Sequence, residues 1–231
     1  MLRKGAIWAL AAAIWALAAC GSGEPPPGAG AGSEQDPDPP VAEAPAQDAR
    51  PVLVAFGDSL TAGHGVGPGA SYPAFLQREI DRRGLGFRVV NEGVSGDTTA
   101  RALSRVDVAL SHGPEWVILG LGANDGLRGL PIAAMEENLA DMIRSFEEGG
   151  ARVLLAGMML PRNYGPEYVE DFDAVYPRLA ERFDLPLIPF LLQDVAMVRD
   201  LNNRDGIHPN ADGNRIVARN VADALEALVR E

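Results

Sequence analysis

Nearly continuous apolar runs alternate with amphipathic segments along most of this chain, and this alternation restricts the possible folds more than any other feature. The apolar runs lie at residues 52–56, 87–90, 116–121, 152–157 and 187–190. They do not alternate between apolar and polar positions, which is typical of strands covered on both faces. Helical patterns follow them at about residues 72–83, 98–111, 131–148, 168–183 and 213–230. The sequence therefore predicts a parallel, doubly wound α/β sheet.

Polar or glycine-rich clusters follow each of the predicted strands. They are Gly57-Asp58-Ser59-Leu60 and residues 91–98, 122–126, 159–165 and 205–209. The carboxyl ends of parallel strands meet at one edge of a sheet, and ligands of open α/β sheets bind beyond that edge. We therefore expect the five clusters to form one functional site.

Ser59 is the candidate nucleophile of this site. A serine hydroxyl needs an adjacent base, which is itself oriented by a third group. Of the three histidines, His64 follows Ser59 closely and His112 lies in a turn before the third strand. His208 has Asp205 three residues before it, so one compact turn can join the carboxylate to the imidazole. We predict a triad of Ser59, His208 and Asp205, although Gly-Asp-Ser alone is equally compatible with a simple turn or helix start.

Ester hydrolysis also needs hydrogen-bond donors that meet the developing oxyanion. The sequence offers the backbone N–H groups of Ser59 and Gly93 and the side-chain amide of Asn124. Gly93 has no Cβ, so its backbone can approach a substrate closely. The aspartates Asp58, Asp97 and Asp125 are near the same edge, and we expect them to brace turns without a direct catalytic part.

These motifs resemble the four sequence blocks of the GDSL/SGNH hydrolases. The blocks are Gly57-Asp58-Ser59-Leu60, Gly93, Gly122-Ala123-Asn124-Asp125 and Asp205-Gly206-Ile207-His208-Pro209, in the order of that family. Residues 91–99, 122–130, 160–165 and 174–179 resemble, more narrowly, the secreted thioesterase, arylesterase and lysophospholipase branch. One departure is Ala123, where this branch often has glycine.

The resemblance implies a flavodoxin-like three-layer α/β/α sandwich with a five-stranded parallel sheet in the order 2-1-3-4-5. It implies a covalent acyl-serine intermediate, no metal and no other cofactor. It also implies Ser59 as nucleophile, His208 as base and then acid, and Asp205 as the group that orients His208. The oxyanion donors would be Ser59, Gly93 and Asn124.

Leu160, Pro161 and Tyr164 follow the fourth predicted strand. In the branch named above, the corresponding loop lines the acyl-binding groove, which implies a medium or long acyl ester or an aryl ester as substrate. The alternative is that these residues pack over the sheet edge without touching a substrate.

The N-terminus resembles a bacterial lipoprotein signal. Arg3 and Lys4 precede an apolar run at residues 6–16, and small residues lead to Cys20, the only cysteine of the chain. This pattern predicts a signal peptide at residues 1–19 and lipidation of Cys20, although an ordinary secretory signal is the alternative. Residues 20–50 are rich in Pro, Gly, Ala and acidic residues, which predicts a disordered tether. The hydrolase domain is expected at residues 51–231.

The formal net charge of −12 makes nucleic acid and anionic lipid surfaces poor partners. The expected partners are a small-molecule or lipid ester and the membrane reached through Cys20. Gly21 after the cysteine favours the outer membrane. The sequence leaves the oligomeric state open, with a monomer as the default.

Three functions remain open at this stage. The first is an exported, envelope-anchored esterase acting on lysophospholipid-like or simple esters, since acyl-CoA and acyl carrier protein are cytoplasmic. The second is a carbohydrate O-acetylesterase of the cell envelope. The third is a non-catalytic envelope-binding lipoprotein, which would be expected to lack a member of the triad.

Overall fold

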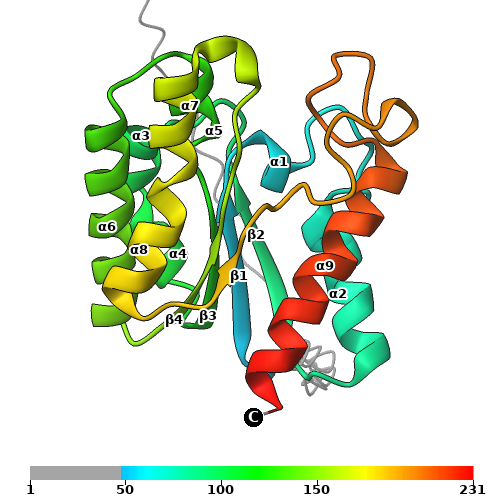
Figure 1. Cartoon of the computed structure of the whole chain (residues 1–231). Coiled ribbons are helices and arrows are strands. Elements are labelled where there is room, and N and C mark those ends of the chain that lie inside the picture. Colours follow the sequence, from blue (N-terminus) through cyan, green and yellow to red (C-terminus); the bar gives the residue numbers. More distant parts are fainter. Residues whose placement is uncertain (1–47, 231) are drawn as a thin grey trace, which may run out of the picture. The chain divides into compact units, whose positions relative to one another are not determined.

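The computed structural model describes residues 48–230 of the chain (Figure 1). The predicted signal peptide, the lipidation site Cys20 and nearly all of the predicted tether lie outside the described residues. None of the helices in this described part is long and apolar enough to cross a membrane.

The centre of the domain is a five-stranded sheet whose strand pairs are all parallel. Its strands are β1 (Val52–Gly57), β2 (Arg88–Gly93), β3 (Pro114–Gly120), β4 (Arg152–Ala156) and β5 (Leu187–Ile188). Their order is β2-β1-β3-β4-β5, as expected. Every residue of β1 is buried, because the strand lies inside the sheet and helices cover both of its faces. The continuous apolar pattern is thereby explained.

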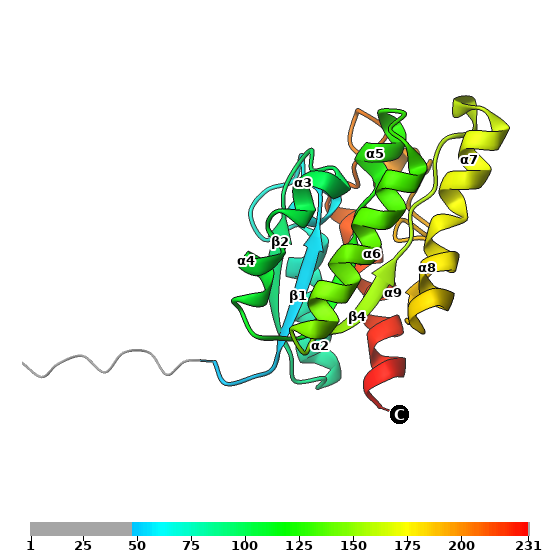
Figure 2. The same ribbon diagram turned by 90° about the vertical axis from the view of Figure 1, so that its left-hand side faces the viewer.

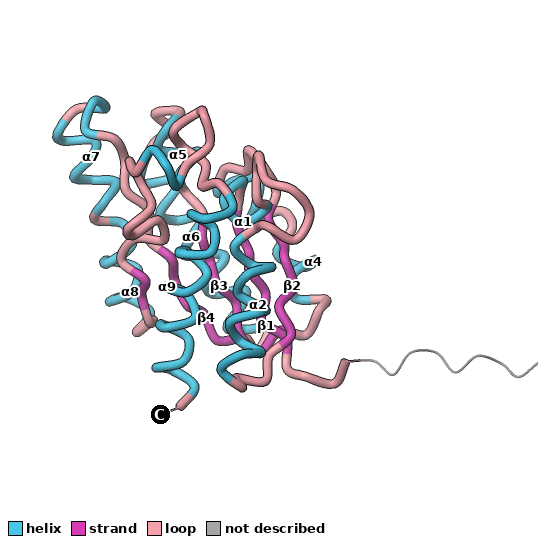
Figure 3. The backbone as a smooth tube through the Cα atoms, turned by 90° about the vertical axis from the view of Figure 1, so that its right-hand side faces the viewer, coloured by secondary structure: helices cyan, strands magenta, loops and turns pink. Residues whose placement is uncertain are grey.

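Helices cover both faces of the sheet, which gives the three predicted layers. On one face lie α2 (Tyr72–Arg83) and α9 (Ala211–Val229), which pack against each other (Figure 3). The other face carries α3 (Thr99–Leu103), α4 (Val106–Leu110), α6 (Ile132–Glu148), α7 (Pro166–Asp173) and α8 (Val175–Phe183) (Figure 2). Two further short helices, α1 (Ser59–Ala62) and α5 (Ala123–Leu127), begin at the carboxyl ends of β1 and β3. Short 3-10 turns occupy Arg162–Tyr164 and Arg199–Leu201.

Two of the predicted helices are each divided in two. The pattern at residues 168–183 becomes α7 and α8, with the break at Ala174. Pro177 explains the break, because proline has no N–H to donate to the carbonyl four residues earlier. The pattern at residues 98–111 becomes α3 and α4, which are separated by Ser104 and Arg105.

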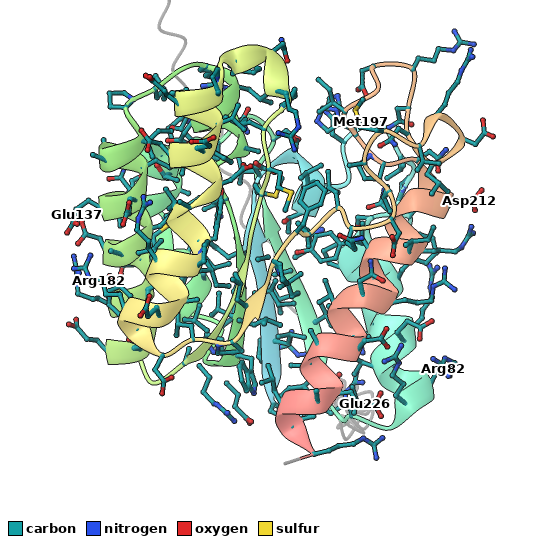
Figure 4. All side chains as sticks on the ribbon, in the orientation of Figure 1. Arg82, Glu137, Arg182, Met197, Asp212 and Glu226 are labelled. Atoms are coloured by element: carbon teal, nitrogen blue, oxygen red, sulfur yellow. The ribbon has the colours of Figure 1, made fainter. Side chains whose placement is uncertain are left out.

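The hydrophobic core fills the space between the sheet and the helices (Figure 4). Trp116, Tyr72, Tyr176, Phe56 and Phe146 are its largest fully buried side chains. The ring of Phe56 on β1 meets that of Phe146 on α6 edge to face, with 5.3 Å between centroids. This packing fixes β1, and with it the loop that carries Ser59.

Candidate active site

Ser59 lies at the sharp junction between β1 and α1. Asp58 caps the helix: its carboxylate accepts the Leu60 N–H at 3.0 Å, and Ser59 is the first helical residue. Gly57 ends the strand where a Cβ would collide with Thr61 and with the backbone of Gly120. The turn therefore depends on a glycine, a buried aspartate and a partly buried serine in that order.

His208 and Asp205 lie next to Ser59, almost 150 residues further along the chain. His208 Nε2 is 2.9 Å from Ser59 Oγ, and His208 Nδ1 is 2.8 Å from Asp205 Oδ2. Asp205 Oδ1 accepts the backbone N–H groups of His208 and Ile207 at 3.0 and 2.9 Å. These hydrogen bonds lower the pKa of Asp205 to about 2, and the bond from the His208 backbone N–H has the largest effect. An ionised Asp205 favours the proton on Nδ1, which leaves Nε2 free to accept from Ser59.

Asn124 reaches the site from the start of α5. Its Nδ2 donates to Asp58 Oδ2 at 3.3 Å, and the same nitrogen carries a second N–H. Burial is the main cause that raises the pKa of Asp58 to about 6. Asp58 thus braces the turn, as expected, and it also orients the Asn124 amide.

Gly93, which was expected to be an oxyanion donor, already has a hydrogen-bond acceptor within the protein. Its backbone N–H donates to Asn91 Oδ1 at 2.9 Å, so this group is not free to meet an oxyanion. A Cβ on Gly93 would collide with the backbone of Thr61 and Ala62, which explains the glycine by close packing against α1. Three residues later, Gly96 has a φ of +83°, and no described residue accepts a hydrogen bond from its N–H. The repeated glycines of this loop were the available signal, and they could not distinguish the two positions.

Asp97 and Asp125 brace the surrounding loops, as expected. Asp125, buried at the start of α5, accepts the Thr99 N–H at 2.9 Å and the Thr99 hydroxyl at 2.7 Å. Asp97 accepts from Arg105 Nε at 2.7 Å. The bonds of Asp125 join α5, which follows β3, to α3, which follows β2, and the bond of Asp97 ties the loop after β2 to the connection between α3 and α4.

Sequence reasoning missed Arg105. Its guanidinium donates to the carbonyls of Gly57 and Glu92, both at 2.8 Å, and lies over the Phe56 ring. It thereby joins the carboxyl ends of β1 and β2. Its place in a helical pattern gave no signal, because an arginine there is normally solvent-exposed.

The three candidate groove residues have different environments. Leu160 is buried and packs closely against Gly126 of α5, and the Tyr164 hydroxyl donates to the Leu127 carbonyl at 3.0 Å. Pro161 is exposed. Packing over the sheet edge thus accounts for Leu160, whereas Met159 beside it is half exposed. His112 pairs with Glu92 at 2.7 Å and not with the triad.

The fold and the site define the class of this protein as a hydrolase of carboxylic esters that has a serine, a histidine and an aspartate in hydrogen-bond contact. The chain belongs to the GDSL-like Lipase/Acylhydrolase family, whose sequence profile matches residues 55–216.

Individual relatives agree with this assignment. "Thioesterase 1/protease 1/lysophospholipase L1" of Escherichia coli (strain K12) is 40% identical over 182 residues, which cover 78% of this chain and 86% of the relative. "Esterase TesA" of Pseudomonas aeruginosa is 39% identical over 184 residues, covering 79% and 92%. The crystal structure of AlinE4, an SGNH-hydrolase family esterase, matches with a TM-score of 0.66 at 41% identity, covering 78% of this chain and 96% of that one.

Proposed function

We propose that Ser59, His208 and Asp205 form the catalytic triad of this ester hydrolase. The observation that carries the proposal is the continuous hydrogen-bond chain from Ser59 Oγ through the His208 ring to Asp205, at 2.9 and 2.8 Å. Asp205 holds the imidazole in the tautomer that accepts a proton, and its negative charge stabilises the imidazolium that forms.

In the first half of the reaction, Ser59 Oγ attacks the carbonyl carbon of the ester while its proton passes to His208 Nε2. The tetrahedral intermediate collapses as the C–O bond to the alcohol breaks. His208 Nε2 gives its proton to the leaving oxygen, and the acyl group remains on Ser59. In the second half, water attacks the acyl-serine, with His208 again accepting and returning a proton, and the carboxylic acid leaves.

For the oxyanion we propose three donors: the backbone N–H of Ser59, the side-chain amide of Asn124 and the backbone N–H of Gly96. Gly96 replaces Gly93 in this role. The reasons are that the Gly93 N–H already has the Asn91 side chain as its acceptor, whereas no described residue accepts from the Gly96 N–H.

As substrates we propose acyl esters of the lysophospholipid-like or simple aryl type. Relatives named as a lysophospholipase and thioesterase and as an esterase support this class. The alternative of a carbohydrate O-acetylesterase predicts a strong preference for acetyl over octanoyl esters, so a profile of acyl-chain length separates the two. A non-catalytic role would require that the triad be incomplete or inert.

We propose further that the enzyme is exported and anchored by a lipid on Cys20, with residues 1–19 as signal peptide and residues 20–50 as tether. The single cysteine behind small residues supports this. The domain at residues 51–231 would then stand off the membrane. Replacing Cys20 by serine should move the protein from the membrane fraction to the soluble fraction, and unchanged membrane recovery would contradict the anchor.

The decisive experiment replaces Ser59 by alanine. The variant should lose p-nitrophenyl ester turnover and labelling by a fluorophosphonate probe. Ser104→Ala is a matched control, because Ser104 is an exposed serine whose hydroxyl donates only to the carbonyl of Arg101. Wild-type turnover in Ser59→Ala would overturn the proposal.

A further inference from the structure

A second histidine lies directly against His208. His64, just after α1, has its ring centroid 4.5 Å from that of His208, and the two ring planes are tilted by 45°. His64 is exposed, and the proposed reaction gives it no task. The chain has only three histidines, so two of them in contact at the reactive serine require an explanation.

The backbones that carry the two rings are fixed to each other through Asn203. The Asn203 N–H donates to the His208 carbonyl at 2.8 Å, and Asn203 Nδ2 donates to the His64 carbonyl at 3.3 Å. The His64 N–H also donates to the Ser59 carbonyl at 3.0 Å. Both imidazoles are therefore held near each other before any ligand arrives.

The same place contains a carboxylate. One possible ligand atom from each of His64, Asp205 and His208 lies within 4.8 Å of the other two. Two imidazoles and one carboxylate are a ligand set that binds Zn²⁺ and leaves a fourth position open. Ligands of one tetrahedral zinc ion lie roughly 3.3 Å apart, so a modest rotation of side chains is enough to close the site.

We propose that His64, His208 and Asp205 form a binding site for a divalent transition-metal ion such as Zn²⁺, and that the bound ion inhibits the hydrolase. The inhibitory part rests on the proposed role of His208 as the base. His208 and Asp205 alone provide only two ligands. His64 supplies the third ligand, which turns this pair into a chelating group.

Inhibition follows from the electron count of the imidazole. A neutral imidazole has one nitrogen lone pair, and its other nitrogen carries a proton. An ion bound at Nε2 takes the lone pair that faces Ser59. An ion bound at Nδ1 leaves the proton on Nε2, which then cannot accept another. In either case His208 cannot take the Ser59 proton while the ion is bound.

The test measures Zn²⁺ binding and Zn²⁺ inhibition separately on the untagged full chain. All variants carry Cys20→Ser, so that the single thiol of the chain does not compete for the metal. Calorimetric titration with ZnCl₂ gives the binding constant, and ester turnover at buffered Zn²⁺ gives the inhibition constant relative to the metal-free rate of each variant. Excess EDTA should restore turnover.

The test compares His64→Gln with His112→Gln, which removes the histidine that pairs with Glu92 away from the triad. We expect the binding and inhibition constants to agree in the reference protein. His64→Gln should weaken both by at least about tenfold, as expected when part of a metal site is lost, and His112→Gln should weaken neither.

Equal Zn²⁺ affinity in His64→Gln and the reference protein would overturn the inference, as would an equal loss in His112→Gln. Binding that depends on His64 in a protein without any ester turnover would support the metal site and overturn only the proposed function.

Discussion

The two halves of the candidate active site are held in place by different means. The half around Ser59 and Asn124 is built on buried polar groups: Asp58, Thr99 and Asp125 are at most 3% exposed. The half that carries Asp205 and His208 is an irregular segment before α9. In this segment Ile207 is 51% exposed, and Met197 is 90% exposed, with its side chain in solvent (Figure 4).

This difference determines which changes should affect folding as well as catalysis. Buried polar groups cost much free energy when they lose their partners, so the Ser59 half couples activity to stability. The Asp205 carboxylate itself is held by solvent-exposed hydrogen bonds from the Ile207 and His208 N–H groups and the His208 ring, and such bonds contribute little to folding. We therefore expect changes at Asp205 to reduce activity while the folded state keeps most of its stability.

The largest expected effect is in the exposed half. Asp205→Asn keeps an oxygen for the backbone N–H groups, but its amide N–H can face His208 Nδ1 and favour the wrong tautomer. We expect kcat to fall by about 10³ to 10⁴ with only a small decrease in melting temperature, because the hydrogen bonds that lower the pKa of Asp205 are exposed to solvent. Ester turnover and thermal unfolding measure the two effects. Asp200→Asn is the control, because Asp200 is exposed in the same segment. A rate loss below about tenfold would contradict the role of Asp205.

Asn124→Ala tests the donor side of the buried half. Removing one oxyanion donor costs roughly 10² to 10³ in kcat, and the variant also takes a hydrogen-bond donor from the buried Asp58. We therefore expect a rate loss accompanied by a larger decrease in melting temperature than in Asp205→Asn. Asn220 on α9, which is half-buried and whose amide donates to the Gln193 carbonyl, supplies the control Asn220→Ala. An unchanged kcat would remove Asn124 from the list of donors.

The two halves also differ in how far the sequence predicted them. The strand order and the proximity of Ser59, His208 and Asp205 could be predicted, because local motifs indicated the residues and the parallel topology places their loops at one edge. The sequence could not separate Gly93 from Gly96, because a glycine packed against α1 and a glycine whose N–H has no described acceptor look the same in sequence. Arg105 was missed because its contacts with Gly57 and Glu92 are made across the fold.

Asp58 links the buried half to pH. Its pKa is about 6 in the folded protein and about 3.9 in an unfolded chain, so the folded state binds the proton more tightly. The stabilisation from this proton is present below about pH 4 and is lost as the pH rises through 6. The free energy of unfolding should fall by at most about 3 kcal/mol over this range. Urea unfolding between pH 4 and 7 should show this decline, and Asp58→Asn should flatten it. The same slope in both proteins would contradict the raised pKa.

The smallest effect is expected for Thr99→Val, which keeps the shape of the side chain and removes the hydroxyl that donates to Asp125 at 2.7 Å. Loss of a hydrogen bond to a buried charge should lower the free energy of unfolding by about 1.5 to 3 kcal/mol. Thr98→Val is the matched control, because the neighbouring Thr98 makes no capping hydrogen bond with its side chain. Urea unfolding measures both variants. Equal stability of the two would mean that burial of Asp125 does not hold this half of the site, and the contrast with the exposed half would then rest on Asp58 alone.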